Sequence, residues 1–164
     1  MSAMWKDILS RNLILRLKVT GKSMTPFLIG GEVLTIKNVR GAPLRLGDLI
    51  LYKTRDGSLL LHRIVSKGRK RDTPIFQTKG DALLSADEPV FARDVLGKVI
   101  RIEKMRPEGK TIHIDMESLP QRSINYLIAI AGLYKSRVCF AVQKSSLYPL
   151  LRLVKKTLVK ISAV

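Results

Sequence analysis

The chain has 164 residues, of which 46% are hydrophobic, and its formal net charge at neutral pH is +17. This length and composition predict one domain with appended elements and exclude an intrinsically disordered protein. The single cysteine, Cys139, excludes an internal disulfide, and no metal-ligand spacing is present, so we expect neither a metal nor a cofactor.

The N-terminal segment, residues 1–18, is predicted to be amphipathic. Its apolar residues favour a short helix that runs into a strand. Charged residues interrupt every apolar stretch in this region, so we expect no cleavable signal peptide. These charged residues are Lys6, Asp7, Arg11, Arg16 and Lys18.

Residues 20–28 read Thr-Gly-Lys-Ser-Met-Thr-Pro-Phe-Leu. Gly21 permits a close backbone approach, and Pro26 fixes φ at the end of the turn. A hydroxyl held on such a bend, that of Ser23, is a candidate nucleophile, with its own backbone N–H as the candidate oxyanion donor. The alternative is an ordinary loop serine.

Residues 18–116 have mostly the pattern of strands. Alternation and short apolar runs predict strands at residues 33–37, 49–54, 58–66, 75–79, 95–105 and 111–116. Asp56-Gly57 predicts a hairpin turn, and the very basic residues 67–73 predict a solvated loop. The spacing is typical of a mainly β fold, a small coiled antiparallel domain over residues 19–118.

Within this region, His62 lies in an apolar strand, and residues 78–90 contain the acids Asp81 and Asp87. A serine hydroxyl needs a base near neutral pH, and neutral imidazole suits this role. The imidazolium then needs a carboxylate to hold its tautomer and balance its charge. We favour Asp87 as the partner of His62, with Asp81 shaping the loop or sharing the role. A structural histidine and exposed turn acids are the alternative.

Three lysines and a second histidine are the other side chains that could act as a base. Lys22, Lys53 and Lys79 are alternative bases, but each would need desolvation to lower its pKa. His113 alternates with two isoleucines, so we expect it on the surface. An extended peptide is expected to bind along strand edges, and the candidate contacts are Gly21, Met24, Leu59 and Leu61.

The C-terminal part, residues 119–164, is predicted to be a basic amphipathic helical tail. Helical spacing is present at residues 123–143 and 145–161, which predicts two helices. After Glu117 the chain has no acidic residue but eight basic ones. Basic residues mixed with leucine, isoleucine and valine favour an anionic membrane surface as partner and make nucleic acid unlikely. The first helix falls short of the roughly 20 apolar residues that a spanning helix needs. A helical hairpin that packs on the β-domain is an alternative to membrane contact, and the sequence favours neither over the other.

Four motifs occur in a fixed order: Gly-x-Ser-Met-x-Pro-x-Leu at 21–28, Gly-Asp-Leu-Ile-Leu-Tyr at 47–52, Leu-His-Arg-Ile-Val at 61–65 and Thr-Lys-Gly-Asp at 78–81. Together they resemble the successive boxes of type I signal peptidases over residues 19–105. His62 makes the chain similar to the endoplasmic-reticulum and archaeal type, which also occurs in some Gram-positive bacteria. The resemblance implies a preprotein substrate with small residues at the first and third positions before the cut. Members of the family usually have an N-terminal membrane anchor, and the charged residues 1–19 depart from that pattern.

The sequence therefore predicts a membrane-associated serine endopeptidase that cleaves extended leader or signal peptides by Ser-His-Asp acyl transfer, without indicating which side of the membrane it faces. The alternative is a non-catalytic cationic module of the same fold that binds membranes or nucleic acid. A self-cleaving regulator of the SOS-repressor type has less support, because no helix-turn-helix precedes residue 20 and the base box contains histidine.

Overall fold

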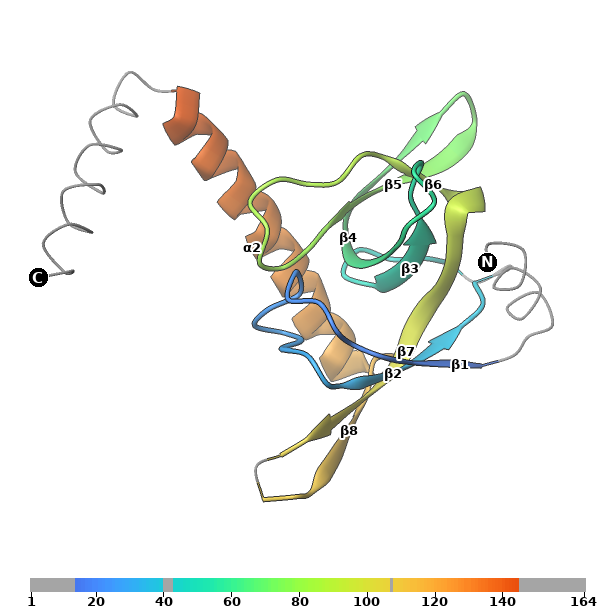
Figure 1. Cartoon of the computed structure of the whole chain (residues 1–164). Helices are drawn as coiled ribbons and strands as arrows, with labels where there is room; N and C mark the ends of the chain where they lie inside the picture. Colours follow the sequence, from blue (N-terminus) through green and yellow to red (C-terminus); the bar gives the residue numbers. More distant parts are fainter. Residues whose placement is uncertain (1–13, 40–42, 107, 145–164) are drawn as a thin grey trace, which may run out of the picture.

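The computed structural model describes residues 14–39, 43–106 and 108–144, with side chains up to residue 136. Within these ranges the protein is mainly β, with one antiparallel sheet of eight strands and one C-terminal helix (Figure 1). The second helix predicted at residues 145–161 and most of the N-terminal segment lie outside the described residues.

The sheet has the strand order β1-β2-β7-β3-β4-β5-β6, and β8 pairs with β7. A short 3₁₀ helix, η1 (Ala92–Asp94), precedes β7. The strands are β1 (Leu15–Lys18), β2 (Val33–Lys37), β3 (Leu49–Lys53), β4 (Leu59–Lys70), β5 (Thr73–Lys79), β6 (Val90–Phe91), β7 (Val95–Met105) and β8 (Thr111–Asp115).

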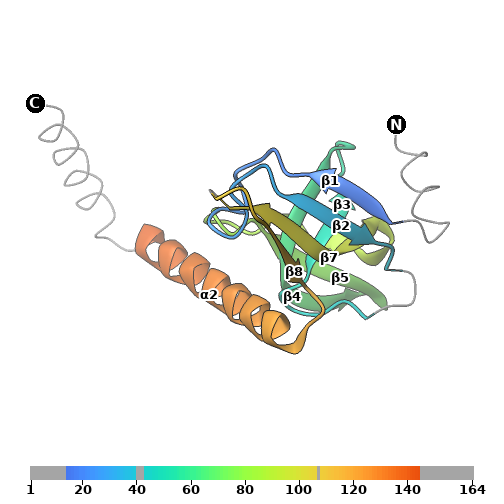
Figure 2. The same cartoon turned by 90° about the horizontal axis from the view of Figure 1, so that it is seen from below.

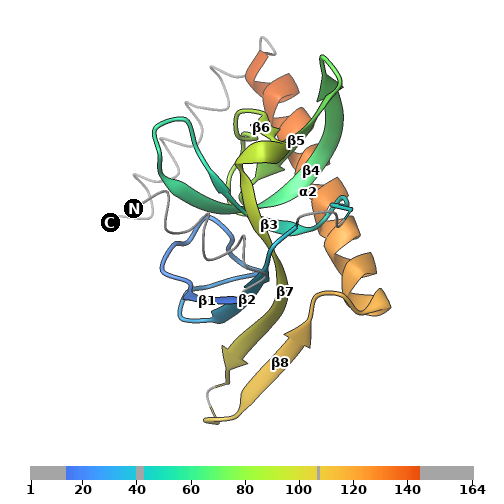
Figure 3. The same cartoon turned by 90° about the vertical axis from the view of Figure 1, so that its right-hand side faces the viewer.

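Strand β7 organises the sheet, since it pairs with β2, β3 and β8 and runs the length of the domain (Figure 3). The register shifts at three places, in the pairs β2–β7, β3–β7 and β4–β5. Such irregularities add local bend and twist, so the sheet coils on itself. The strand predicted at residues 95–105 is confirmed at both ends.

Strand β3 separates two hydrophobic clusters. Leu49 and Leu51 pack into one cluster with Met24 and Leu28, whereas Ile50 and Tyr52 belong to the other. Successive side chains of a strand point to opposite faces, so β3 is buried on both faces. His62 is opposite Ile50 in the β3–β4 register and therefore faces the second cluster.

The prediction of a solvated loop at residues 67–73 is wrong. Strand β4 continues to Lys70, and β5 begins at Thr73 after a two-residue turn. Arg71 and Asp72 in that turn have φ of 45° and 61°, a conformation that matches the twist of a tight hairpin. The highly charged segment therefore forms an exposed two-stranded β-ribbon. Its charged side chains stay in water while its backbone groups form the hydrogen bonds between β4 and β5.

Helix α2 (Leu119–Lys144) begins four residues before the predicted start at residue 123 and lies along one side of the β-domain, next to β4 (Figure 2). Its Pro120 is tolerated because the first turn needs no N–H donor there. A Cβ at Gly47 would come within 2.6 Å of the Asn125 carbonyl carbon, so only glycine allows this close contact. Within the described ranges, no helix has the length and apolar character needed to cross a bilayer.

Candidate active site

Ser23 lies in a hydrogen-bonded turn whose apolar residues anchor it to the core. Thr25 N–H donates to the Lys22 carbonyl, and Leu28 N–H donates to the Met24 carbonyl, at 3.1 and 2.9 Å. The side chains of Met24 and Leu28 are buried in the first core cluster, whereas Ser23 is half-buried. The turn therefore presents a hydroxyl on a backbone that the core holds in place.

The start of the β5–β6 loop holds the same turn from the other side. Ala82 N–H donates to the Ser23 carbonyl at 2.9 Å. A Cβ at Gly80 would lie 2.6 Å from that oxygen and 3.0 Å from the Leu83 side chain, so the approach requires glycine. The sequence did not indicate this contribution of Gly80, which appears there only as one residue of the Thr-Lys-Gly-Asp motif.

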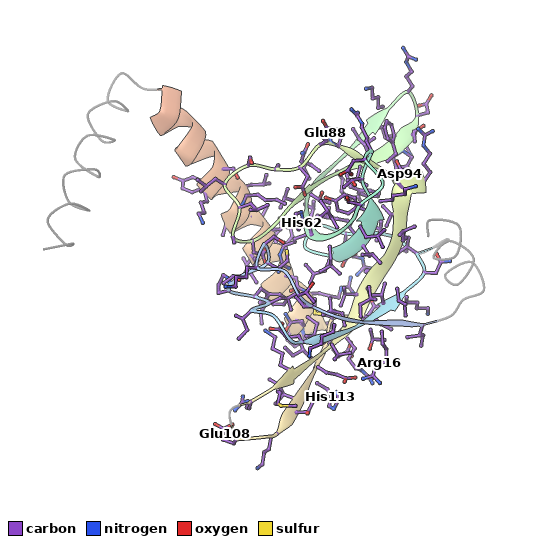
Figure 4. The ribbon with its side chains drawn as sticks, in the orientation of Figure 1. Arg16, His62, Glu88, Asp94, Glu108 and His113 are labelled. Carbon is purple, nitrogen blue, oxygen red and sulfur yellow. The ribbon has the colours of Figure 1, made fainter. Side chains whose placement is uncertain are left out.

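His62 joins Ser23 to Asp87. Its ring is almost fully buried, with Nε2 3.0 Å from Ser23 Oγ and Nδ1 2.7 Å from Asp87 Oδ2. An ionised carboxylate only accepts hydrogen bonds, so Nδ1 carries the proton and Nε2 is free to accept the serine proton. Figure 4 places His62 in the body of the domain and His113 far away on β8, where it is exposed as predicted.

Asp87 accepts three hydrogen bonds at a single oxygen. Besides His62, the hydroxyls of Tyr52 and Thr78 donate to Oδ2 at 3.0 and 2.8 Å. Burial raises the pKa of Asp87, but the hydrogen bonds from His62, Thr78 and Tyr52 and the charge of His62 outweigh it, so the pKa is lowered. The carboxylate is thus held ionised behind the imidazole.

Tyr52 and Thr78 were not among the sequence candidates. Burial raises the pKa of Tyr52, and the Asp87 carboxylate raises it further, so the phenol remains a donor. In the observed β3–β4 register, Tyr52 is opposite Leu60, two residues before His62 on the same strand face. Without the sheet register, however, the tyrosine is indistinguishable from a core aromatic residue.

Asp81 has a different partner from Asp87. Arg63 Nε and Nη2 donate to its two carboxylate oxygens at 2.8 and 2.7 Å. Arg63 Nη1 also donates to the Gly47 carbonyl and to Asn125 Oδ1 of α2. The guanidinium has no exposed surface and lies 4.6 Å from the Phe27 ring centre. Asp81 therefore helps to shape the loop and does not contact His62.

The three lysines considered as alternative bases differ in their surroundings. Lys22 is exposed, and Lys53 is half-buried at the end of β3. Lys79 is opposite Arg63 in the β4–β5 register, so both side chains occupy the sheet face opposite to that of His62. The base next to Ser23 Oγ is the histidine.

The four predicted substrate contacts differ in accessibility. Gly21 and Leu59 are exposed and Leu61 is half-buried, whereas Met24 packs in the core. A Cβ at Gly21 would meet no atom within 4 Å, so packing within the chain does not require glycine there. A pocket of about 610 Å³ lies beside Asp87, between the β3–β4 turn and β6.

The described residues contain no group of three or more histidine, cysteine, aspartate or glutamate side chains that is suited to a metal ion. No protein-family model matches the chain, and no curated protein matches it either. The site brings a hydroxyl, an imidazole and a carboxylate into hydrogen-bond contact, the arrangement needed to activate an alcohol for acyl transfer.

Proposed function

We propose that the protein is a serine endopeptidase of the signal-peptidase type that acts on extended peptides beside a membrane. The observation that carries the proposal is the position of His62, whose two ring nitrogens lie 3.0 Å from Ser23 Oγ and 2.7 Å from Asp87 Oδ2. The order of the sequence motifs around these residues supports the same assignment.

In this mechanism Ser23 Oγ attacks the scissile carbonyl while His62 Nε2 takes its proton. Asp87 holds the Nδ1 proton and balances the imidazolium charge, and the Ser23 backbone N–H stabilises the oxyanion. His62 next passes its proton to the leaving amine, and the acyl-enzyme forms. Water then attacks the acyl-enzyme with His62 again as base, which frees the serine and releases the second product.

An exposed sheet edge supports the choice of an extended peptide as substrate. The β4–β5 pairing ends at Arg63 and Lys79, and β3 pairs with β4 as far as Leu59. In the described part of the sheet, residues 59–61 thus have a strand partner on one edge only. A peptide that pairs with the other edge reaches Ser23 by strand addition, with backbone hydrogen bonds supplying affinity.

The surface of helix α2 supports a membrane as partner. Six of its large hydrophobic side chains are exposed to solvent, and the chain from residue 118 onward contains basic residues but no acidic ones. Such a surface favours the interface of an anionic bilayer. The exposed side chains are Leu119, Ile124, Tyr126, Leu127, Ile130 and Tyr134.

Active-site labelling tests the proposal. Purified protein is treated with a fluorophosphonate probe, and the labelled residue is identified by mass spectrometry. We expect labelling at Ser23 that is lost in Ser23→Ala and strongly reduced in His62→Ala. Ser66→Ala is the matched control, since this serine is exposed on the same strand as His62. Labelling and peptide cleavage that persist in Ser23→Ala would contradict the proposal.

The net charge of +17 favours a second candidate, a non-catalytic cationic module. It predicts salt-sensitive binding to anionic vesicles or duplex DNA. Such binding, together with an absence of both labelling and peptide turnover, would favour this candidate over the peptidase.

A further inference from the structure

Lys79 is a buried cation that the peptidase mechanism does not use. Its side chain is 1% exposed, and among the buried side-chain polar atoms of the described residues its Nζ alone has no hydrogen-bond partner. Burial lowers the pKa of Lys79 and the charge of Lys135 lowers it further, whereas the charges of Asp81 and Asp87 raise it without restoring its ordinary value. Because an unpaired buried ammonium is costly, its retention calls for a compensating group.

The nearby acids act on this amine through their charge but do not hydrogen-bond to it. Both oxygens of Asp81 accept hydrogen bonds from Arg63, so that pair is already balanced. Asp87 accepts its side-chain hydrogen bonds from His62, Tyr52 and Thr78, so only its charge acts on Lys79. The face below α2 therefore combines a buried amine that lacks a hydrogen-bond partner, that of Lys79, with the exposed Lys135 of the helix, whose charge acts on it.

A pocket opens at the same place. It encloses about 420 Å³ between the Ser23 turn and α2, and its lining combines apolar side chains with Asp81 and Lys135. Gly132 belongs to this lining, and a Cβ there would lie 3.6 Å from Lys79 Nζ. The buried amine is thus directly beside the pocket. The apolar lining consists of Pro26, Phe27, Ile128 and Ala131.

We propose that this pocket binds an oxyanion attached to an aliphatic chain, with the oxyanion between Lys79 Nζ and Lys135 Nζ and the chain against the apolar wall. A fatty carboxylate and the phosphate of a lipid share this chemistry. A charge-assisted hydrogen bond from Lys79 supplies its missing partner, and the aliphatic chain buries the exposed apolar surface. The ligand touches Pro26 and Phe27, so it stabilises the turn that bears Ser23.

The test is a binding measurement that does not depend on peptidase activity. Decanoate and dihexanoyl phosphatidylglycerol, each below its micelle concentration, are titrated against the protein by calorimetry. Decanol supplies the chain without the charge, and acetate supplies the charge without the chain. Lys79→Met removes the amine at similar length, and Ala131→Phe blocks the pocket from an exposed position. Lys110→Met is the control, because Lys110 is an exposed lysine near the β7–β8 turn.

We expect saturable binding of at least one amphiphile, weakened about tenfold or more in Lys79→Met and Ala131→Phe and unchanged in Lys110→Met. The probe that binds identifies the source as a carboxylate or a lipid phosphate. Equal affinity in wild type and Lys79→Met would overturn the proposal, as would decanol binding as tightly as decanoate or no saturable binding of either amphiphile. If Lys79→Met does not fold, unchanged affinity in Ala131→Phe overturns it instead.

Discussion

Replacing Asp87 by asparagine removes one charge from the proposed site and leaves its shape intact. In the wild type the carboxylate accepts hydrogen bonds from His62, Tyr52 and Thr78, all at Oδ2. Since the two hydroxyls donate to that position, we expect the introduced amide to place its oxygen there. Nδ1 of His62 then keeps its proton and its tautomer, and only the charge compensation of the imidazolium is lost.

The size of that loss follows from the separation of the two groups. The Nδ1 to Oδ2 distance is 2.7 Å, so the charge centres are further apart than these two atoms. At roughly 4 Å and an effective dielectric constant of about 20, two unit charges attract by about 4 kcal/mol. If this attraction is lost from the transition state, kcat should decrease by about a thousandfold, with little change in KM.

Steady-state hydrolysis of a fluorogenic peptide measures this effect. Asp72→Asn is the matched control, because Asp72 is exposed and has a positive φ, which asparagine tolerates. A kcat for Asp87→Asn within tenfold of the wild-type value would refute the assigned role of this carboxylate, provided that circular dichroism shows an unchanged fold.

The lowered pKa of Asp87 adds a second readout, the free energy of unfolding against pH. A carboxylate with a depressed folded-state pKa contributes stability that is fully present above its unfolded pKa of about 3.9 and is lost as pH falls through the folded value. The stability difference between wild type and Asp87→Asn should therefore shrink as pH falls from about 5 through the folded pKa. A difference that stays constant over this range would contradict the ionised state of Asp87.

Three further substitutions test the surroundings of the site. Tyr52→Phe removes one donor from Asp87, so kcat should fall about tenfold and the pKa of Asp87 should rise, as read by NMR titration of its side-chain carboxyl; an unchanged pKa would argue against this contact. Arg63→Met leaves Asp81 buried without its partner, so chemical denaturation should reveal a loss of about 3–5 kcal/mol; a loss below about 1 kcal/mol would contradict a buried pair. Gly80→Ala forces a Cβ against the carbonyl of the nucleophile turn, so kcat should fall while the sheet signal in circular dichroism persists; full activity would show that the turn tolerates the shift.

Local sequence patterns predicted much of the sheet. Alternation and turn residues identified β2, β3, β7 and β8 within a residue at either end, because side chains that face a core repeat every second position. The same reasoning failed for residues 67–73. There the backbone forms a hairpin whose side chains remain in water. The amino-acid composition of this segment therefore does not distinguish a paired strand from a solvated loop.

The sequence by itself indicated the residue types of the proposed site, since local chemistry together with motif order selected Ser23, His62 and the two acids. The sequence favoured Asp87 over Asp81 as the partner of His62 but left a shared role open, whereas the tertiary structure pairs Asp87 with His62 and Asp81 with Arg63. The deciding quantity is the register of β4 against β3 and β5, because neighbouring residues of a strand face opposite sides of a sheet. That register depends on contacts between residues distant in the chain, which local sequence patterns do not contain. For the same reason, the contacts of Tyr52 and Thr78 with Asp87 and the unpaired amine of Lys79 could not be predicted from the sequence.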